Sequence, residues 1–325
     1  MSGTDPAVTV SIVIPCRDHA AALARCLASL RAQTAEPSVE TIVVDSSDDR
    51  SAVEAAKAFP GVVLVKSPTP LRPGPARNRG AEVAKGKYLL FVDADCTVEG
   101  EWLREAVGQL RQGRRIVGGP VLHGQPWHPV AVIDNLMQFL SLGPEQPAGT
   151  VQLLPSCNFC IGKADFEETP GFPTLEHPAG EDVLFFAEAR RRWPGALCFH
   201  PGMRVRHFGR SGWAAFLAHQ ASFGYIRAFY ALETKAIHLD WGRHRWMLPA
   251  IAMRRLFFLY SRALSYPRSL VYLLLLFPVL LAGVAAWSAG FHKGCKARAG
   301  QARPNVSPHD SDEPAKASAA VRDRR

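Results

Sequence analysis

The stretch from Tyr88 to Cys96 constrains the fold more than any other part of the chain. Five apolar or aromatic residues run without a break and are followed by two acids, Asp93 and Asp95. A short apolar run of this kind is typical of a strand buried on both faces of a parallel sheet. Acids at the carboxyl end of such a strand lie at the edge where open α/β sheets bind ligands. The alternative is a simple strand-to-turn cap, because aspartate is a common turn residue.

Strand-like and helix-like segments alternate along the chain. Strands are expected at 8–14, where Pro15 ends the first, and at 40–45, 62–65 and 88–92. The helices between them are expected at 18–33, 50–58 and 74–84. Further on, the pattern predicts a helix at 102–110, a strand at 115–122 and a helix at 128–142. Alternation at this spacing predicts βαβ units and a mostly parallel sheet.

Composition narrows the choice of partners. The 325 residues suffice for one α/β domain with an appendage, and the net charge of +9 suits an anionic ligand such as a nucleotide or an anionic membrane surface. No helix-turn-helix, zinc-finger or aromatic-basic pattern points to nucleic acid. The seven cysteines form no even framework, so they are expected to be reduced, buried thiols, Cys157 and Cys160 included. Residues 1–7 are short and polar, so no signal peptide is expected there.

Four motifs resemble those of family 2 glycosyltransferases of the glycosyltransferase-A fold, in order and in spacing. They are Ile14-Pro15-Cys16-Arg17-Asp18, Val43-Val44-Asp45, Ala76-Arg77-Asn78-Arg79-Gly80 and Phe91-Val92-Asp93-Ala94-Asp95. The resemblance covers about residues 8–225. It implies an α/β, Rossmann-like mixed sheet flanked by helices, as in nucleotide-diphospho-sugar transferases.

The resemblance also implies roles for these residues on the donor side of a reaction. Asp45 and the turn of Pro15, Arg17 and Asp18 would meet the base and ribose of a UDP- or GDP-sugar. Asp93 would bind the ribose or a metal, and Asp95 would hold Mn²⁺ or Mg²⁺ on the diphosphate. Arg77 would add positive charge at the phosphates, although an arginine on a helix surface is the simpler interpretation.

The second half of the chain carries the remaining candidates. Asn158 lies in a segment that resembles the family's short strand beneath the acceptor, where it would bind substrate. Glu181 and Asp182 resemble the family's Glu-Asp motif at a helix start, with Glu181 binding substrate and Asp182 acting as the catalytic base; a simple helix cap is the alternative. His207 stands where many such enzymes place a histidine metal ligand, although a lone histidine is more often structural.

One family motif is missing. Processive members carry Gln-x-x-Arg-Trp after the base, whereas the nearest stretch here, residues 219–227, reads His-Gln-Ala-Ser-Phe-Gly-Tyr-Ile-Arg. The resemblance therefore predicts the addition of one sugar per encounter rather than polymer synthesis.

The C-terminal part of the sequence predicts an association with a membrane. Residues 269–291 contain no charged side chain and are long enough to span a bilayer or, with Pro278 in the middle, to form a re-entrant hairpin. Residues 229–268 mix arginines with aromatics and indicate an interfacial amphipathic segment, with packing against the catalytic domain as the alternative. Residues 1–7 and 292–325 are expected to be disordered, which leaves 8–228 as the catalytic domain.

Together these features predict an inverting, metal-dependent glycosyltransferase at the inner or cell membrane, with its catalytic domain in the cytoplasm. The acceptor would be a hydroxyl of a lipid, a lipid-linked saccharide or a saccharide. A nucleotidyltransferase is a second hypothesis, but the Gly-rich, Lys-containing loop it usually needs after the first strand is missing. A catalytically inactive, membrane-bound sugar-nucleotide-binding protein is a third. The presence of Asp45, Asp93, Asp95 and Asp182 together argues against it.

Overall fold

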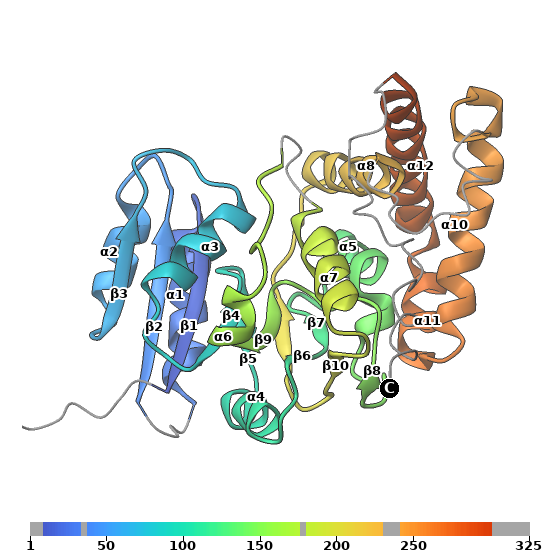
Figure 1. Cartoon of the computed structure of the whole chain (residues 1–325). Helices are drawn as coiled ribbons and strands as arrows, with labels where there is room; N and C mark the ends of the chain where they lie inside the picture. The colour runs from blue at the N-terminus through green and yellow to red at the C-terminus, as the bar shows by residue number, and fades with distance from the viewer. Residues whose placement is uncertain (1–8, 34–37, 176–179, 230–240, 301–325) are drawn as a thin grey trace, which may run out of the picture.

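A mixed eight-stranded sheet, with strand order β3-β2-β1-β4-β9-β6-β10-β8, runs through the molecule (Figure 1). The computed structural model describes residues 9–33, 38–175, 180–229 and 241–300. The predictions of disorder for residues 1–7 and 301–325 lie outside these ranges. Large helices flank the sheet, and the C-terminal helices lie beyond the end of the sheet opposite β3 (Figure 1).

The first half of the sheet is parallel, as predicted. Its strands are β1 (Val10–Cys16), β2 (Val39–Asp45), β3 (Val62–Lys66) and β4 (Tyr88–Val92). The connecting helices are α1 (Ala20–Arg31), α2 (Ser51–Lys57) and α3 (Pro73–Val83). One detail differs, because β1 continues through Pro15 to Cys16. Its pairing with β4 stops at Val13, and a strand with a single partner uses only every second N–H, so a proline is tolerated there.

The second half turns the sheet from parallel to mixed. β9 (Asn158–Gly162) lies antiparallel between β4 and β6 (Ile116–Gly118), and β10 (Leu197–Phe199) and the short β8 (Gly149–Thr150) complete the edge. The strand predicted over 115–122 is wrong as a single element. It is divided into β6 and β7 (Val121–His123), which belong to different sheets. The break lies at Gly119, where a Cβ atom would meet the Met203 carbonyl oxygen at 2.0 Å.

A second, three-stranded sheet begins just beyond the carboxyl end of β4. Its order is β5-β11-β7, with β5 (Cys96–Val98) and β11 (Val205–His207) antiparallel. β5 begins directly after Asp95 and β11 ends on His207, which pairs with Cys96. This small sheet therefore brings two predicted metal ligands together from distant parts of the sequence.

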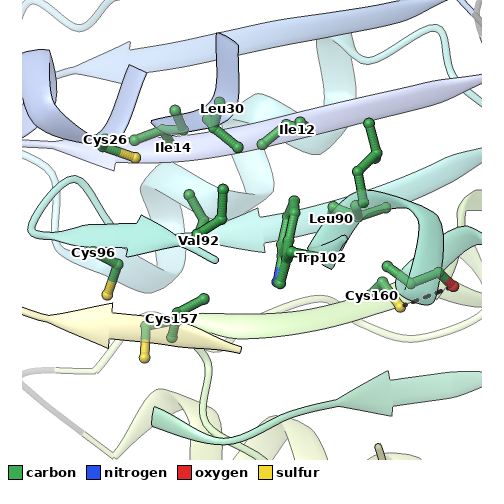
Figure 2. Packing of buried hydrophobic residues seen from close by; sticks show 14 of the residues in the cluster. Ile12, Ile14, Cys26, Leu30, Leu90, Val92, Cys96, Trp102, Cys157 and Cys160 are labelled. Carbon is green, nitrogen blue, oxygen red and sulfur yellow. Dashed lines mark hydrogen bonds between the residues drawn. The ribbon is translucent and has the colours of Figure 1, made fainter. Parts of the chain in front are cut away.

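The large sheet separates two cores. Along β4, Leu90 and Val92 pack with α1 and with α4 (Trp102–Arg111), whereas Leu89 and Phe91 pack under α3, α6 (Lys163–Glu167) and α7 (Glu181–Arg192). Figure 2 shows Trp102 of α4 among the strand residues of the first core. All seven cysteines are buried and free, which confirms their prediction as buried thiols without a disulfide.

The remaining helices form a third cluster. They are α5 (Pro129–Phe139) with a 3-10 turn at Leu140–Leu142, α8 (Trp213–Phe229), a 3-10 turn at Arg245–Met247, α10 (Leu248–Ala263), α11 (Pro267–Leu275) and α12 (Phe277–Gly300). α12 lies closely against α8, since a Cβ at Gly290 would meet the Ala221 carbonyl oxygen at 1.8 Å. Residues 292–300 belong to α12, so the predicted disordered tail does not begin at 292.

The apolar segment predicted over 269–291 is divided between two helices. Across the described part of the chain, no single helix is both long and apolar enough to cross a bilayer. α11 and α12 meet that requirement only when taken together, and they are bent by 88° at their junction.

Candidate active site

The candidate site begins where β1 and β2 end side by side. Asp45 closes β2 with a fully buried side chain, which accepts hydrogen bonds from the Ser47 backbone N–H at 2.9 Å and from Lys66 Nζ at 2.9 Å. The Ser47 hydroxyl in turn accepts the Asp18 N–H at 2.8 Å. These contacts lock the turn after β1 against the loop after β2. The turn after β1 also contains the remaining residues predicted to bind the nucleoside. Pro15 is half-buried, whereas Arg17 and Asp18 are exposed.

The turn at Asp18 has a left-handed backbone, with φ of 56°. Such a conformation is uncommon for residues other than glycine, and aspartate is among those that tolerate it. Non-glycine residues with this backbone occur at ligand-binding sites more often than elsewhere. The prediction that Arg17 and Asp18 contact a nucleotide is compatible with this geometry and stays a prediction.

The buried guanidinium of Arg77 joins two acids from distant segments. It is 1% exposed and donates to Asp93 Oδ1 at 2.6 Å and to Glu181 Oε1 at 3.1 Å. Gly74 in the first turn of α3 makes this approach possible, because a Cβ there would meet Glu181 Cγ at 2.9 Å. Arg77 was predicted to contact phosphates, whereas its observed contacts hold the end of β4 and the start of α7 together.

Asp182 follows Glu181 in the first turn of α7 and therefore lies beside the same guanidinium. Burial and the negative charge of Glu181 raise the pKa of the Asp182 carboxyl to about 7, while Arg77 acts in the opposite direction. One Asp182 oxygen accepts the Val183 N–H at 2.8 Å within the first turn of α7, whose N-cap is Gly180. A carboxyl that exchanges its proton near neutral pH is suited to act as a general base.

Asp95 and His207 meet across the junction of the two sheets. His207 Nε2 lies 3.4 Å from Asp95 Oδ2, and the Phe208 N–H donates to the Asp95 carbonyl oxygen at 2.9 Å. Burial alone would raise the pKa of Asp95, but His207, followed by His19 and Arg210, lowers it to about 2. The pair therefore consists of an ionised carboxylate beside an imidazole, and the metal-binding role predicted for both residues stays a prediction.

The donor set fits a divalent ion that also binds a substrate. Within the described ranges, no three His, Cys, Asp or Glu side chains converge on one point. Mg²⁺ is usually held by one or two carboxylates together with substrate phosphates rather than by a cage of protein ligands. Asp95 and His207 match that arrangement, and the buried Nδ1 of His207 has no hydrogen-bond partner among the described residues.

Asn158 occupies a different environment from the other candidates. Its fully buried amide accepts a hydrogen bond from Trp102 Nε1 at 2.8 Å and donates to the carbonyl oxygens of Pro120 and Met203 at 3.1 Å and 2.7 Å. All of these contacts are with the framework below the site. The substrate contact predicted for Asn158 stays a prediction.

Sequence reasoning missed a polar network beside His207. Asp134 on α5 is fully buried and accepts hydrogen bonds from His219 and Gln220 of α8, and His219 also meets Arg210. The available signal was a single acid within the otherwise apolar helix predicted over 128–142, because a charge placed in such a helix must be paired inside the protein.

Open α/β sheets bind ligands in the crevice beyond the carboxyl ends of their strands, which is where Asp45, Asp93 and Asp95 lie. Residues 11–168 match the model of the family described as Glycosyl transferase family 2. The match spans just under half of the chain and supports a glycosyltransferase.

Proteins of similar sequence also bear the name glycosyltransferase. The chain is 28% identical over 232 residues to the pre-mycofactocin glycosyltransferase of Mycobacterium tuberculosis, which covers 66% of this chain and 46% of the relative. It is 24% identical over 256 residues to glycosyltransferase AglE of Haloferax volcanii, covering 76% of this chain and 77% of AglE. The chain thus spans less than half the length of the first relative.

Solved structures share the fold. The crystal structure of S. aureus TarS 1-349 in complex with UDP-GlcNAc superimposes with a TM-score of 0.50 and 16% sequence identity, covering 90% of this chain and 93% of that one. At this level of identity the likeness concerns the fold alone. It confirms the predicted mixed sheet flanked by helices.

Proposed function

We propose that this chain transfers one sugar from a UDP- or GDP-sugar to an acceptor hydroxyl, with inversion at the anomeric carbon and with a divalent metal. The observation that carries the proposal is the Arg77 guanidinium, which bonds Asp93 on one side and Glu181, the neighbour of Asp182, on the other. Acids of the donor side and the candidate base are thereby held around one site. The UDP-GlcNAc bound to TarS, a protein of the same fold, supports a nucleotide-sugar donor.

The donor's nucleoside would bind at the ends of β1 and β2. Asp45 is held there as a hydrogen-bonding group by Ser47 and Lys66, and the Asp18 turn lies against it. Asp93 follows at the end of β4, where a ribose hydroxyl could be bound. This order along the sheet edge leads from the nucleoside towards Asp95 and His207, where the diphosphate would lie.

Asp95 and His207 would hold Mn²⁺ or Mg²⁺ on the diphosphate. When bound, the ion supplies positive charge that offsets the charge developing on the departing diphosphate. Asp182 takes the proton from the acceptor hydroxyl. The hydroxyl oxygen then attacks the anomeric carbon from the face opposite the nucleotide diphosphate, which leaves with the bonding electrons and inverts the configuration.

The C-terminal helices support an acceptor at a membrane. α10 and α11 expose a set of large apolar side chains, here called the α10–α11 face, which comprises Trp246 just before α10, Met253, Phe257, Phe258, Leu264, Val271, Leu274 and Leu275. Large apolar side chains exposed in this number on two successive helices favour a surface that binds a partner or a membrane. We infer that this face holds the enzyme on the inner side of the cell membrane, where a lipid or lipid-linked saccharide would be the acceptor.

A donor screen tests the proposal. The full chain is incubated with a panel of UDP- and GDP-sugars, Mn²⁺ and a membrane extract, and the released nucleotide diphosphate is measured. We expect release from one donor class, its loss on adding EDTA, its return with Mn²⁺, and products that carry a single added sugar. Activity that EDTA leaves unchanged would exclude the metal, and no release from any donor would contradict the transfer itself.

A further inference from the structure

A cavity opens at the end of the large sheet opposite the candidate active site. Its volume is about 670 Å³, which lies within the range of sites that bind small molecules. It lies at the start of β4 and the end of β9, whereas Asp93 follows the other end of β4. The five residues of β4 rise about 16 Å, so the cavity is separate from the candidate site.

Basic side chains dominate the lining of this cavity. Five lining residues are basic and two are acidic, an excess of three positive charges: Lys87, Arg111, Arg114, Arg115 and Lys163 against Asp165 and Glu167. Tyr88 and Leu110, both buried, add an apolar part. A concave surface lined mainly by one sign of charge concentrates the electric field and draws in ligands of the opposite charge.

Both acids of the cavity are engaged by basic neighbours. Arg115 Nη1 donates to Asp165 Oδ1, and Lys163 Nζ lies 3.7 Å from Glu167 Oε1. Each pair offsets its own charge. The positive excess therefore comes from the three remaining basic residues of the lining.

Two of these three residues, Lys87 and Arg114, make no ion pair within the described ranges. Arg114 Nη1 donates to Cys198 Sγ at 3.5 Å, and a thiol sulfur is a weak acceptor. Lys87 Nζ lies 5.4 Å from the centre of the Tyr88 ring. Neither contact supplies a carboxylate, so an anionic ligand would provide the charge that balances both side chains.

The backbone holds both residues in fixed positions. After α4, the N–H groups of Gly113 and Arg114 bond back to carbonyl oxygens of the last helical turn, at 3.1 Å and 3.2 Å. These are the two bonds of a Schellman cap, and the left-handed backbone of Gly113, with φ of 86°, is the conformation this cap requires. At the start of β4, the Lys87 carbonyl oxygen accepts the Lys163 N–H at 2.8 Å.

We propose that this cavity binds a small, soluble ligand that carries at least two phosphate charges. Lys87, Arg111 and Arg114 bind the phosphate oxygens through charge-assisted hydrogen bonds, while Tyr88 and Leu110 contact the carbon skeleton. A soluble ligand is favoured over the phosphate of a lipid headgroup, because no lining residue is a large, exposed apolar side chain that could enter a bilayer. The inference is independent of the proposed transfer reaction.

Calorimetric titration of the full chain with inorganic pyrophosphate tests this inference. EDTA is present, because it removes the divalent ion that would hold a diphosphate at the candidate active site. Lys87→Gln combined with Arg114→Gln should raise the Kd at least about tenfold, since each change removes a charge-assisted hydrogen bond. The control combines Lys57→Gln with Arg104→Gln, which removes the same two types of charge from exposed positions on α2 and α4 and should leave the Kd unchanged.

Melting temperatures separate lost binding from lost folding. Without ligand, the cavity variant should melt like wild type, and pyrophosphate should raise the melting temperature of wild type more than that of the variant. No binding to wild type, or an equal Kd in wild type and cavity variant, would overturn the inference. Equal weakening in both double variants would also overturn it, because binding would then follow the net charge of the protein.

Vesicles that contain phosphatidic acid distinguish the two sources of phosphate. A soluble ligand predicts that the cavity variant and the control variant sediment equally with these vesicles. Weaker sedimentation of the cavity variant alone, together with no binding of pyrophosphate to wild type, would assign the cavity to a lipid headgroup and overturn the soluble ligand.

Discussion

Asp182 is the residue whose protonation state most directly sets the proposed chemistry. Burial and Glu181 raise the pKa of its carboxyl to about 7, so a large share of the molecules carry the proton at neutral pH. A base works only when deprotonated, and kcat/KM should therefore rise with pH up to about 7 and level off above it. A plot of kcat/KM against pH that lacks this rise would argue against Asp182 as the base.

Asp182→Asn should reduce kcat by about a hundredfold to ten-thousandfold, because the acceptor hydroxyl loses its base, while donor affinity changes little. The ionised carboxyl is disfavoured in the folded state, so the neutral amide should keep or raise the melting temperature above pH 7, which separates lost chemistry from lost folding. Glu82→Gln, an exposed acid on α3, is the matched control. Turnover in Asp182→Asn comparable to wild type would remove the base assignment.

Arg77 supports the same acids by a different physical effect. Arg77→Gln would leave Asp93 and Glu181 facing each other without a shared positive charge. Removing one partner of a buried ion pair costs about 3–5 kcal/mol of the free energy of unfolding. Arg79→Gln removes an exposed arginine two positions along α3 and should cost at most about 1 kcal/mol. Urea denaturation of both variants makes the comparison, and equal losses would mean that Arg77 is not the structural bridge described here.

At the scale of elements, α3 depends on a glycine at its contact with the sheet. A Cβ at Gly80 would meet Val13 Cγ1 at 2.3 Å and Val44 Cγ2 at 3.2 Å, so Gly80→Ala should push α3 off β1 and β2. Overpacking of this kind costs about 1–3 kcal/mol in the free energy of unfolding. Arg77 lies on the same helix, so nucleotide-sugar binding should weaken as well.

Gly108→Ala is the matched control, because a Cβ at this position in α4 would meet nothing within 4 Å. Alanine is the better helix former, so this change should stabilise the protein by up to about 1 kcal/mol. Thermal denaturation of both variants separates the local helix effect from the contact with the sheet. If Gly80→Ala is as stable as Gly108→Ala, the close approach of α3 is not needed.

The local nature of sequence signals explains which helices and strands could be predicted. Apolar runs and helical spacing are local signals, and they located β1 to β4 and the helices between them to within a few residues. The division of 115–122 into β6 and β7 was not predictable, because it depends on Met203 lying against Gly119 from a distant part of the chain. A run of apolar residues carries no mark of which sheet each half joins.

At the scale of the whole molecule, the site residues fall into two groups. Those that end a strand or start a helix, such as Asp93, Asp95 and Asp182, could be found because position in the element and the family motif agree. The polar network of Asp134, His219 and Arg210 could not, because its members come from three segments and only the packing of α5 on α8 brings them together. For Arg77 the motif indicated importance, but its role as a bridge to Glu181 needed the three-dimensional structure.

The placement of the C-terminal helices leads to the last prediction. α12 is packed on α8, and α10 lies on the side of α12 away from the catalytic sheet (Figure 1). Within the α10–α11 face, Phe257 and Leu275 are about three quarters exposed, at 75% and 74%. Exposed arginines at 254, 262 and 268 lie on the same helices. Apolar side chains next to basic ones suit a bilayer that contains anionic lipids.

The full chain should therefore sediment with vesicles that contain phosphatidylglycerol, and less so as salt is raised, because the arginine contribution is screened. Replacing both Phe257 and Leu275 by Glu places two carboxylates where the acyl boundary would be and should abolish sedimentation, while release of nucleotide diphosphate with a soluble acceptor is retained. Val63→Glu, at the far edge of the sheet on β3, replaces an exposed apolar side chain by a carboxylate away from the α10–α11 face and should sediment like wild type. Equal sedimentation of the double variant and wild type would mean that the α10–α11 face does not contact the membrane, and the lipid-linked acceptor would lose its structural support.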